Sequence, residues 1–154
     1  MFTEAYPVPA QHNQTQSVPN KGVPRLPTHV IPVHYDIIIK PNIYITKPFI
    51  EGNITIDVLC QNTTQNIIFH GKNLKIIHMS IKTMEFGDEV HDKYLSIENL
   101  KFLKTYEEIL VRTADVLSQG LRYEIYIEYV AELKFPSDGQ GMYWDTYQEG
   151  NEKR

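Results

Sequence analysis

The strongest constraint on the fold is a long alternation of apolar and polar side chains at residues 121–135, which read LRYEIYIEYVAELKF. Successive side chains of a β-strand point to opposite faces of the sheet, so this pattern predicts a long strand with one buried and one solvated face. The expected buried set is Leu121, Tyr123, Ile125, Ile127, Tyr129, Ala131, Leu133 and Phe135. The expected solvated set is Arg122, Glu124, Glu128, Glu132 and Lys134.

Shorter apolar runs between turn residues predict further strands. We expect them at residues 33–40, 49–61, 66–70, 74–84, 93–97 and 109–111. The apolar spacing of residues 98–108 fits either a short helix or a strand, and we favour the strand. Residues 114–120 are expected to form a loop or a single helical turn that Gly120 ends.

Two local patterns refine these strands. Prolines border residues 33–40, so that strand is expected early or at a sheet edge. Glu51-Gly52 predicts a bulge or bend near the start of the next strand. Within residues 74–84, Ile76 and Ile77 are both apolar and change the phase of the alternation, which indicates either a bulge or a strand that crosses between sheets.

Many short strands with almost no helix predict an all-β fold, an antiparallel β-sandwich or a related stack of sheets. The chain has 154 residues, of which 42% are hydrophobic and 22% charged, enough for one domain with its own core. Residues 1–24 are rich in Pro, Gln and Asn without apolar periodicity, so we expect a disordered tail or spacer there. The folded domain is expected at residues 25–154.

Charge and composition restrict the partners and the location. The formal net charge is −4 and basic residues do not cluster, which argues against a nucleic-acid partner. No apolar run is long enough to span a membrane. Asn-x-Ser/Thr triplets begin at Asn13, Asn53 and Asn62, and these possible N-glycosylation sites favour a lumenal or extracellular setting.

The sequence offers no recognisable catalytic motif. None of the histidines opens an H-E-x-x-H zinc motif, and there is no G-x-S-x-G elbow. The single cysteine, Cys60, continues an apolar alternation, so a buried structural thiol is a better interpretation than a nucleophile.

Three residue groups have both a functional and a structural interpretation. His70 and His78 could share a metal ion, but isolated strand histidines are more often solvated or hydrogen-bonded. The glutamates of the long strand could supply an acid–base pair, but a charged face is the usual companion of a buried one. We favour the structural interpretation for both groups. The third group is an aromatic cluster after a Gly-rich turn, which suits corner packing better than a ligand contact; it comprises Tyr143, Trp144 and Tyr147.

Four segments, in order, resemble the N-terminal part of the aminopeptidase-N-like zinc metallopeptidases. They are R-L-P with the later H-Y-D at residues 25–36, F-x-G-x-I-x-I at residues 49–56, I-I-F-H with the following N-L-x-I at residues 67–76, and the alternating strand with G-M-Y-x-x-T-Y at residues 121–147. The structural landmarks of this resemblance are Tyr35, Gly141, Tyr143 and Tyr147.

The resemblance implies the saddle-like, all-β N-terminal domain of these enzymes, which remove N-terminal residues from peptides with a zinc ion. The family's zinc and exopeptidase motifs do not occur in this sequence. The resemblance therefore assigns no catalytic, metal-binding or substrate-binding residue to it. We therefore expect no cofactor in this chain and no peptidase activity from it alone. The implied partners are the catalytic domain of the same parent protein and, through it, peptide substrates. An extracellular or membrane-associated ectodomain is the implied setting, with a cytoplasmic one as the alternative.

A second hypothesis does not need the parent enzyme. The chain could act as a stand-alone β-sandwich interaction module without enzymatic activity. Open sheet edges carry unpaired backbone donors and acceptors, so we also expect a capacity for self-association through them.

Overall fold

The computed structural model describes residues 25–44, 47–84, 93–133, 148–150 and 152–153. All regular structure in these residues is β-strand, which confirms the predicted all-β fold class. The strands are β1 (Val30–Asn42), β2 (Phe49–Cys60), β3 (Thr64–His70), β4 (Leu74–Met84), β5 (Ile97–Leu103), β6 (Glu108–Leu117), β7 (Arg122–Glu132), β8 (Gln148–Glu149) and β9 (Glu152–Lys153). The predicted tail, residues 1–24, lies outside the described residues.

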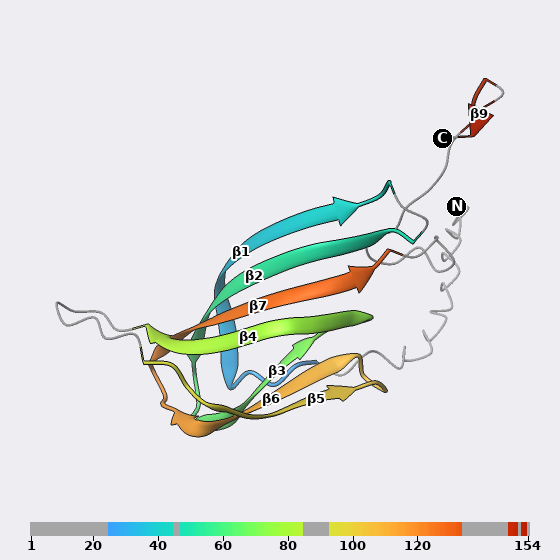
Figure 1. Ribbon diagram of the computed structural model, residues 1–154. Coiled ribbons are helices and arrows are strands. Elements are labelled where there is room, and N and C mark those ends of the chain that lie inside the picture. The colour runs from blue at the N-terminus through green and yellow to red at the C-terminus, as the bar shows by residue number, and fades with distance from the viewer. Residues whose placement is uncertain (1–24, 45–46, 85–92, 134–147, 151, 154) are drawn as a thin grey trace, which may run out of the picture.

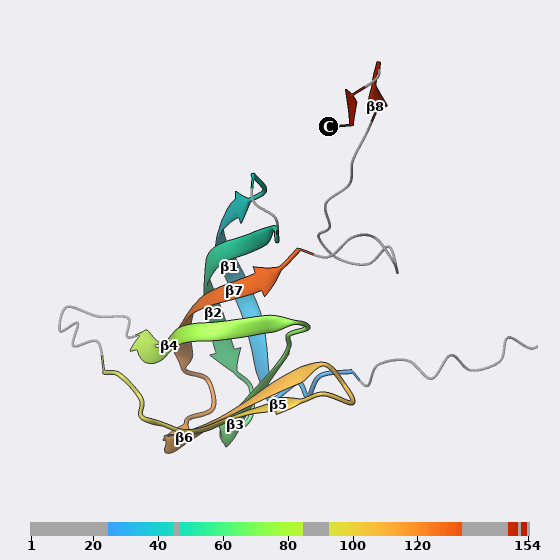
Figure 2. The same cartoon turned by 45° about the vertical axis from the view of Figure 1, so that its right-hand side comes forward.

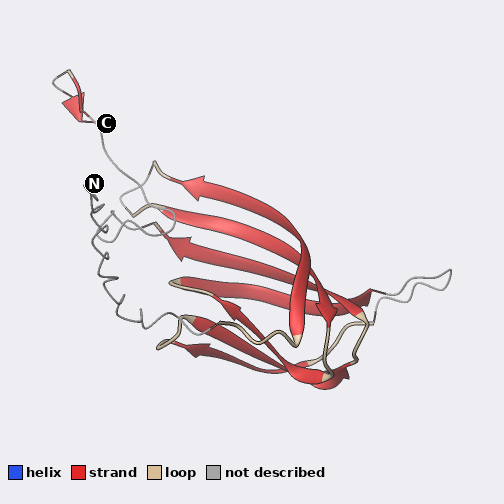
Figure 3. Cartoon of the chain, turned by 180° about the vertical axis from the view of Figure 1, so that it is seen from behind, coloured by secondary structure: helices blue, strands red, loops and turns tan. Residues whose placement is uncertain are grey.

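The strands form two principal antiparallel sheets, which Figure 1 shows as two layers. The larger sheet has four strands in the order β1-β2-β7-β4, and the smaller has three in the order β3-β6-β5. Strands β8 and β9 pair with each other. Seen from behind, the four strands of the larger sheet run side by side as one curved layer (Figure 3).

The alternating stretch forms β7, which lies inside the larger sheet between β2 and β4. Tyr123, Ile125 and Ile127 are at most 4% exposed, so the predicted buried face is confirmed over this part of the strand. Tyr129 and Ala131 are only partly buried. The buried set fails at its first residue: Leu121 precedes the strand and is half exposed. Residues 134 and 135 lie outside the described residues.

The core lies between the two sheets, which separate into distinct layers in Figure 2. The larger sheet contributes the inward residues of β7 and β2, with Ile81 of β4. The smaller sheet contributes Ile109 and Val111 of β6, both at most 1% exposed. Burying these branched and aromatic side chains supplies the main stabilisation of the sandwich.

The hairpin β5–β6 differs from the predicted strands. The strand predicted at residues 93–97 is wrong over residues 93–96: Tyr94 makes one isolated bridge to Lys82, and β5 begins at Ile97. The helical alternative for residues 98–108 is wrong, because β5 continues to Leu103 and a turn leads into β6. The loop expected at residues 114–120 is also wrong over its first half, because β6 continues to Leu117, where the side chain is fully buried.

Of the two positions where a bulge was predicted, only the one in β4 has a bulge. The register between β4 and β7 shifts between Ile76 and His78, so the phase change in β4 is a bulge at Ile77. The bulge predicted at Glu51-Gly52 is wrong, because β2 keeps a regular register there with both neighbours. Gly52 is needed for another reason. It faces Tyr129 of β7, whose ring occupies the space that a side chain at position 52 would need.

Candidate interaction surfaces

Strand β1 is an edge of the larger sheet, as predicted, and most of its apolar side chains are exposed. Tyr35, Ile37 and Ile39 share the inner face with the core residues of β2, because they stand opposite Ile56, Ile54 and Gly52. Nevertheless they are 42–55% exposed. The inner face of the sheet therefore extends past its covered core, and we call these three residues the open inner face.

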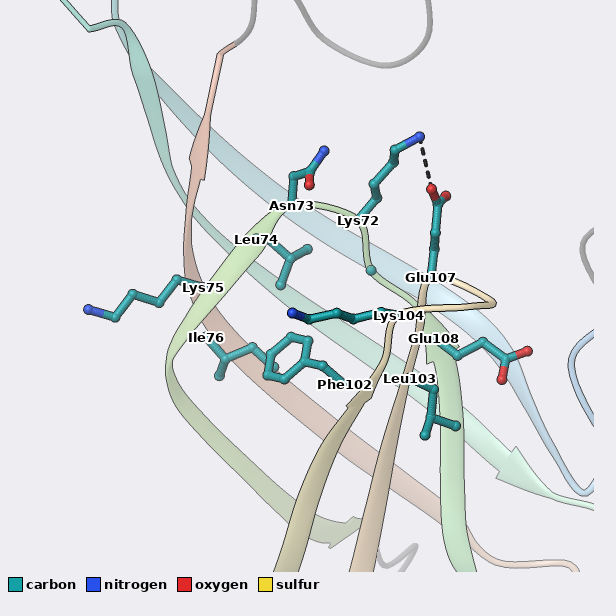
Figure 4. Close-up of a pocket in the computed structure, with 11 residues that line it drawn as sticks. Lys72, Asn73, Leu74, Lys75, Ile76, Phe102, Leu103, Lys104, Glu107 and Glu108 are labelled. Atoms are coloured by element: carbon teal, nitrogen blue, oxygen red, sulfur yellow. Dashed lines mark ion pairs between the residues drawn. The ribbon is translucent and has the colours of Figure 1, made fainter.

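A second surface feature is a cleft of about 630 Å³ between the edge strands β4 and β5. Its apolar lining comes from Leu74, Ile76, Phe102 and Leu103. Figure 4 shows Lys104 extending toward the apolar lining and Lys75 pointing away from it. Lys72 Nζ lies 2.9 Å from Glu107 Oε1 at the rim. This combination can hold an apolar group and an anion. Among the described residues, the lining includes the carboxylates Glu107 and Glu108 but no histidine, serine or cysteine.

Glu124 and Glu128 of β7 contact neighbouring side chains on the outer face of the sheet. Lys82 Nζ lies 3.4 Å from Glu124 Oε1, and the Tyr126 hydroxyl donates a 2.7 Å hydrogen bond to Glu128 Oε1. That hydrogen bond, followed by desolvation and the negative charge of Glu128, raises the pKa of Tyr126. These contacts support the structural interpretation of the glutamates over an acid–base pair.

The structure separates the two histidines considered as metal ligands. His70 ends β3 in the smaller sheet, whereas His78 follows the bulge of β4 in the larger sheet. Within the described ranges, no group of three or more His, Cys, Asp or Glu side chains could hold a metal ion. These residues thus do not provide the ligand set that zinc requires, and we derive no chemistry through a metal in this chain.

Cys60 is fully buried in the core at the end of β2. Its thiol donates to the Asn62 carbonyl at 3.1 Å and lies 3.5 Å from the Leu117 carbonyl. Burial raises the pKa of this thiol, although the hydrogen bond to Asn62 opposes the shift. This environment agrees with an inert structural cysteine.

The possible glycosylation sites differ in their surroundings. Asn62 is exposed in the turn between β2 and β3, whereas Asn53 lies within β2, half-buried between Ile38 of β1 and Glu128 of β7. Asn13 lies outside the described residues. Of the landmarks, Tyr35 is on the open inner face, and Gly141, Tyr143 and Tyr147 lie outside the described residues, as does Trp144. No helix long and apolar enough to cross a membrane occurs in the described part of the chain.

Comparison with known proteins decides the family. The peptidase M1 N-terminal domain matches residues 31–154, most of the chain. The chain belongs to the peptidase M1 N-terminal domain family. Endoplasmic reticulum aminopeptidase 2 of Bos taurus is 37% identical over 126 residues, which cover 80% of this chain and 12% of that protein. Endoplasmic reticulum aminopeptidase 1 of Mus musculus is 33% identical over 130 residues, covering 82% of this chain and 13% of that protein.

The chain also covers only a small share of the length of more distant family members. Aminopeptidase N of Mus musculus is 28% identical over 141 residues, covering 84% of this chain and 14% of that protein. This M1 N-terminal domain therefore spans only 12–14% of the length of these curated relatives. The all-β antiparallel architecture agrees with the family, and the resemblance to the aminopeptidase-N-like enzymes is confirmed.

Sequence reasoning missed the cleft between β4 and β5. Phe102 and Lys104 belong to the segment whose helix or strand state was undecided, so they could not be placed beside Leu74. The only available signal was the apolar-basic composition around residues 72–76 and 101–104, which is common on strand surfaces.

Proposed function

We propose that this chain is the non-catalytic N-terminal β domain of a zinc aminopeptidase, an enzyme that releases N-terminal residues from peptides. The observation that carries the proposal is the family match over residues 31–154, together with relatives named as aminopeptidases. The chemistry would reside in a zinc-binding part of the same parent protein. This domain would contribute shape and an apolar docking surface, and no reacting group.

The open inner face supports this role. An exposed apolar patch that continues a core face commonly marks a contact with another domain. Tyr35, Ile37 and Ile39 offer one aromatic and two branched side chains in a row without an intervening charge on that face. In our proposal the catalytic part of the parent packs against this row.

The first experiment tests the absence of chemistry in the domain. The purified chain is incubated with aminoacyl chromogenic substrates, and its metal content is measured by atomic emission. We expect neither hydrolysis nor stoichiometric zinc. In parallel, the transcript is read past the codon for Arg154, where we expect an open frame that encodes H-E-x-x-H. Substrate turnover by the pure chain, or a frame that contains no such motif, would overturn the proposal.

The second experiment tests the docking surface. The catalytic part of bovine endoplasmic reticulum aminopeptidase 2, without its own N-terminal domain, is mixed with this chain and binding is measured by calorimetry. We expect Ile37→Asp on the open inner face to weaken binding at least tenfold. Phe102→Asp on β5 is the control and should bind like the wild type, because that exposed side chain lies in the smaller sheet.

The possible glycosylation sites suggest where the parent protein is located. We propose a lumenal or extracellular ectodomain, since relatives are named for the endoplasmic reticulum and Asn62 is exposed in a turn. The native protein is treated with an N-glycan-cleaving amidase and compared by mass with its Asn62→Gln variant. A loss of mass in the wild type that is reduced in the variant is expected. A native protein without glycans would favour the cytoplasmic alternative.

A stand-alone interaction module is the second candidate function. The outer edge of β1, which no strand in the described part of the chain covers, favours it, because an extended strand of another protein could pair there. The transcript separates the two candidates: a stop directly after Arg154, with a cooperatively folded chain, favours the module.

A further inference from the structure

No described residue pairs with the outer edge of β1 along residues 34–42. Figure 1 shows β1 at one margin of the larger sheet, with β2 on its inner side. After the register shift between Pro32 and His34, the pairing with β2 runs regularly to Asn42. Among the described residues, none makes a backbone hydrogen bond to the outer side of this segment.

The opposite edge of the same sheet is better protected. Along β4, Ile81 accepts a hydrogen bond from Leu95 at 2.9 Å, and Thr83 donates one to Lys93 at 3.0 Å. The bulge at Ile77 interrupts the rest of that edge. Bulges and covering segments are common protections against strand addition, and the described residues show neither along residues 34–42. The residues of protective type there, Lys40 and Pro41, lie near one end of this segment.

Both faces of β1 are apolar near its middle. Ile37 and Ile39 are exposed on the inner face, and Ile38 is 53% exposed on the outer face. The charged residues are Asp36 and Lys40, which share the outer face with Ile38. Asp36 Oδ2 lies 3.5 Å from Nε2 of His34 in the same strand, and Lys40 stands opposite Glu51 of β2.

These residues select one register for a symmetric pair. Two antiparallel edge strands are related by a two-fold axis normal to the sheet, so facing residues share a face. An axis at Asp36 or at Lys40 would bring like charges together, and an axis at Ile37 would place Lys40 opposite His34. An axis at Ile39 would place Ile38 opposite Lys40 and would form no opposite-charge pair. An axis at Ile38 instead places each Asp36 opposite the other copy's Lys40, and each Ile37 opposite the other copy's Ile39.

We propose that β1 pairs with β1 of a second copy of this chain, antiparallel and centred on Ile38. The larger sheets of the two copies then join into one continuous sheet. Opposite-charge pairs and branched apolar pairs are both favourable when they stand directly across antiparallel strands. Ile37 and Ile39 take part both in this pairing and in the docking proposed above. The pairing also needs Asp36 and Lys40, which lie on the outer face and are not part of the docking surface, so variants at these two residues test the pairing separately.

Charge reversal tests the register. Sedimentation velocity across the micromolar range is recorded for the wild type, Asp36→Lys, Lys40→Asp and the double variant. We expect a concentration-dependent dimer in the wild type and a dissociation constant raised roughly tenfold in each single variant, because each places like charges across the strands. The double variant restores the opposite pairs and should recover most of the association. Circular dichroism checks that every variant is folded.

Cross-linking tests the centre of the pair. Ile38→Cys places two thiols opposite each other, within the reach of a disulfide, whereas a cysteine at His34 would face Asn42 of the other copy. We expect mild oxidation to yield covalent dimer from Ile38→Cys and little from His34→Cys, with buried Cys60 unreactive in both. A monomer at every concentration, single reversals without effect, a double variant that fails to recover, or equal cross-linking at the two positions would each overturn the proposal.

Discussion

The ring of Tyr129 on β7 lies over Gly52 on the neighbouring strand β2, where the two residues stand directly opposite each other. A Cβ placed at Gly52 would lie 2.6 Å from both Cζ and Oη of Tyr129. The glycine therefore gives the tyrosine a place on the inner face, although the strand itself keeps a regular register.

We expect Gly52→Ala to destabilise the chain by about 1–3 kcal/mol, the usual range for overpacking. In a strand without this contact the same change would stabilise, since alanine loses less backbone entropy than glycine on folding. Urea unfolding measures the free energy of the wild type, Gly52→Ala, Tyr129→Ala and the double variant. Removing the ring should abolish the penalty at position 52. An equal penalty in both backgrounds would contradict the role assigned to Tyr129.

Thr113 holds the central part of β6 through a buried hydroxyl. The residue is fully buried, and its Oγ1 lies 2.7 Å from the Asp115 carbonyl and 3.2 Å from the Gln65 carbonyl. Thr113→Val keeps the shape but removes the donor, so we expect a loss of about 1–2 kcal/mol in unfolding free energy. Thr63→Val in the exposed β2–β3 turn is the control, with an expected change of less than about 0.5 kcal/mol. Similar effects at the two positions would show that the buried hydrogen bond contributes little.

The Tyr126 hydroxyl should titrate above its ordinary pKa because it donates to Glu128. The folded chain holds this proton more tightly than the unfolded chain. Its stabilisation is therefore complete below the ordinary tyrosine pKa and is lost as the pH rises through the folded pKa. The chain has 10 tyrosines, so the titration needs site-resolved NMR of the ring carbons. Glu128→Gln should lower the pKa of Tyr126, whereas Glu124→Gln should leave that pKa unchanged.

Cys60 should resist alkylation in the folded chain. Burial raises the pKa of its thiol and blocks access, so the reactive thiolate is scarce. We expect iodoacetamide to modify the wild type only as fast as the chain unfolds, with full reaction in denaturant. Gln61→Cys adds a thiol at the exposed neighbouring position, and mass spectrometry should find rapid modification there alone. Prompt modification of Cys60 in the native chain would contradict its placement in the core.

Residues with a strong period-two pattern were predictable from the sequence. The buried face of β7 and the phase change at Ile77 both follow from strand geometry alone, because each side chain's face is fixed by its position along the strand. The choice between a bulge and a sheet crossing at Ile77 was left open, because it depends on the neighbouring strand.

The remaining errors come from contacts between distant segments. Residues 114–117 read as part of a loop because Ala114 and Asp115 are weak strand formers and Gly120 follows. They become strand because Thr113 and Leu117 are buried and Ala114 donates a 2.9 Å hydrogen bond to the Ser96 carbonyl. Gly52 suggested a bulge because the sequence does not show which side chain will lie over it. The cleft beside β4 was missed for the same reason, since it exists only once β5 is placed.

The strand order has a consequence for the time at which the larger sheet can form during synthesis. Strand β2 pairs with β1 almost at once, but its other neighbour, β7, emerges after four further strands. Pairing across such a separation is slow, since a long loop must close before the contacts form. Until β7 arrives, the nascent β1–β2 hairpin has two open edges that can pair with other chains, so a chaperone that covers strand edges would protect this hairpin.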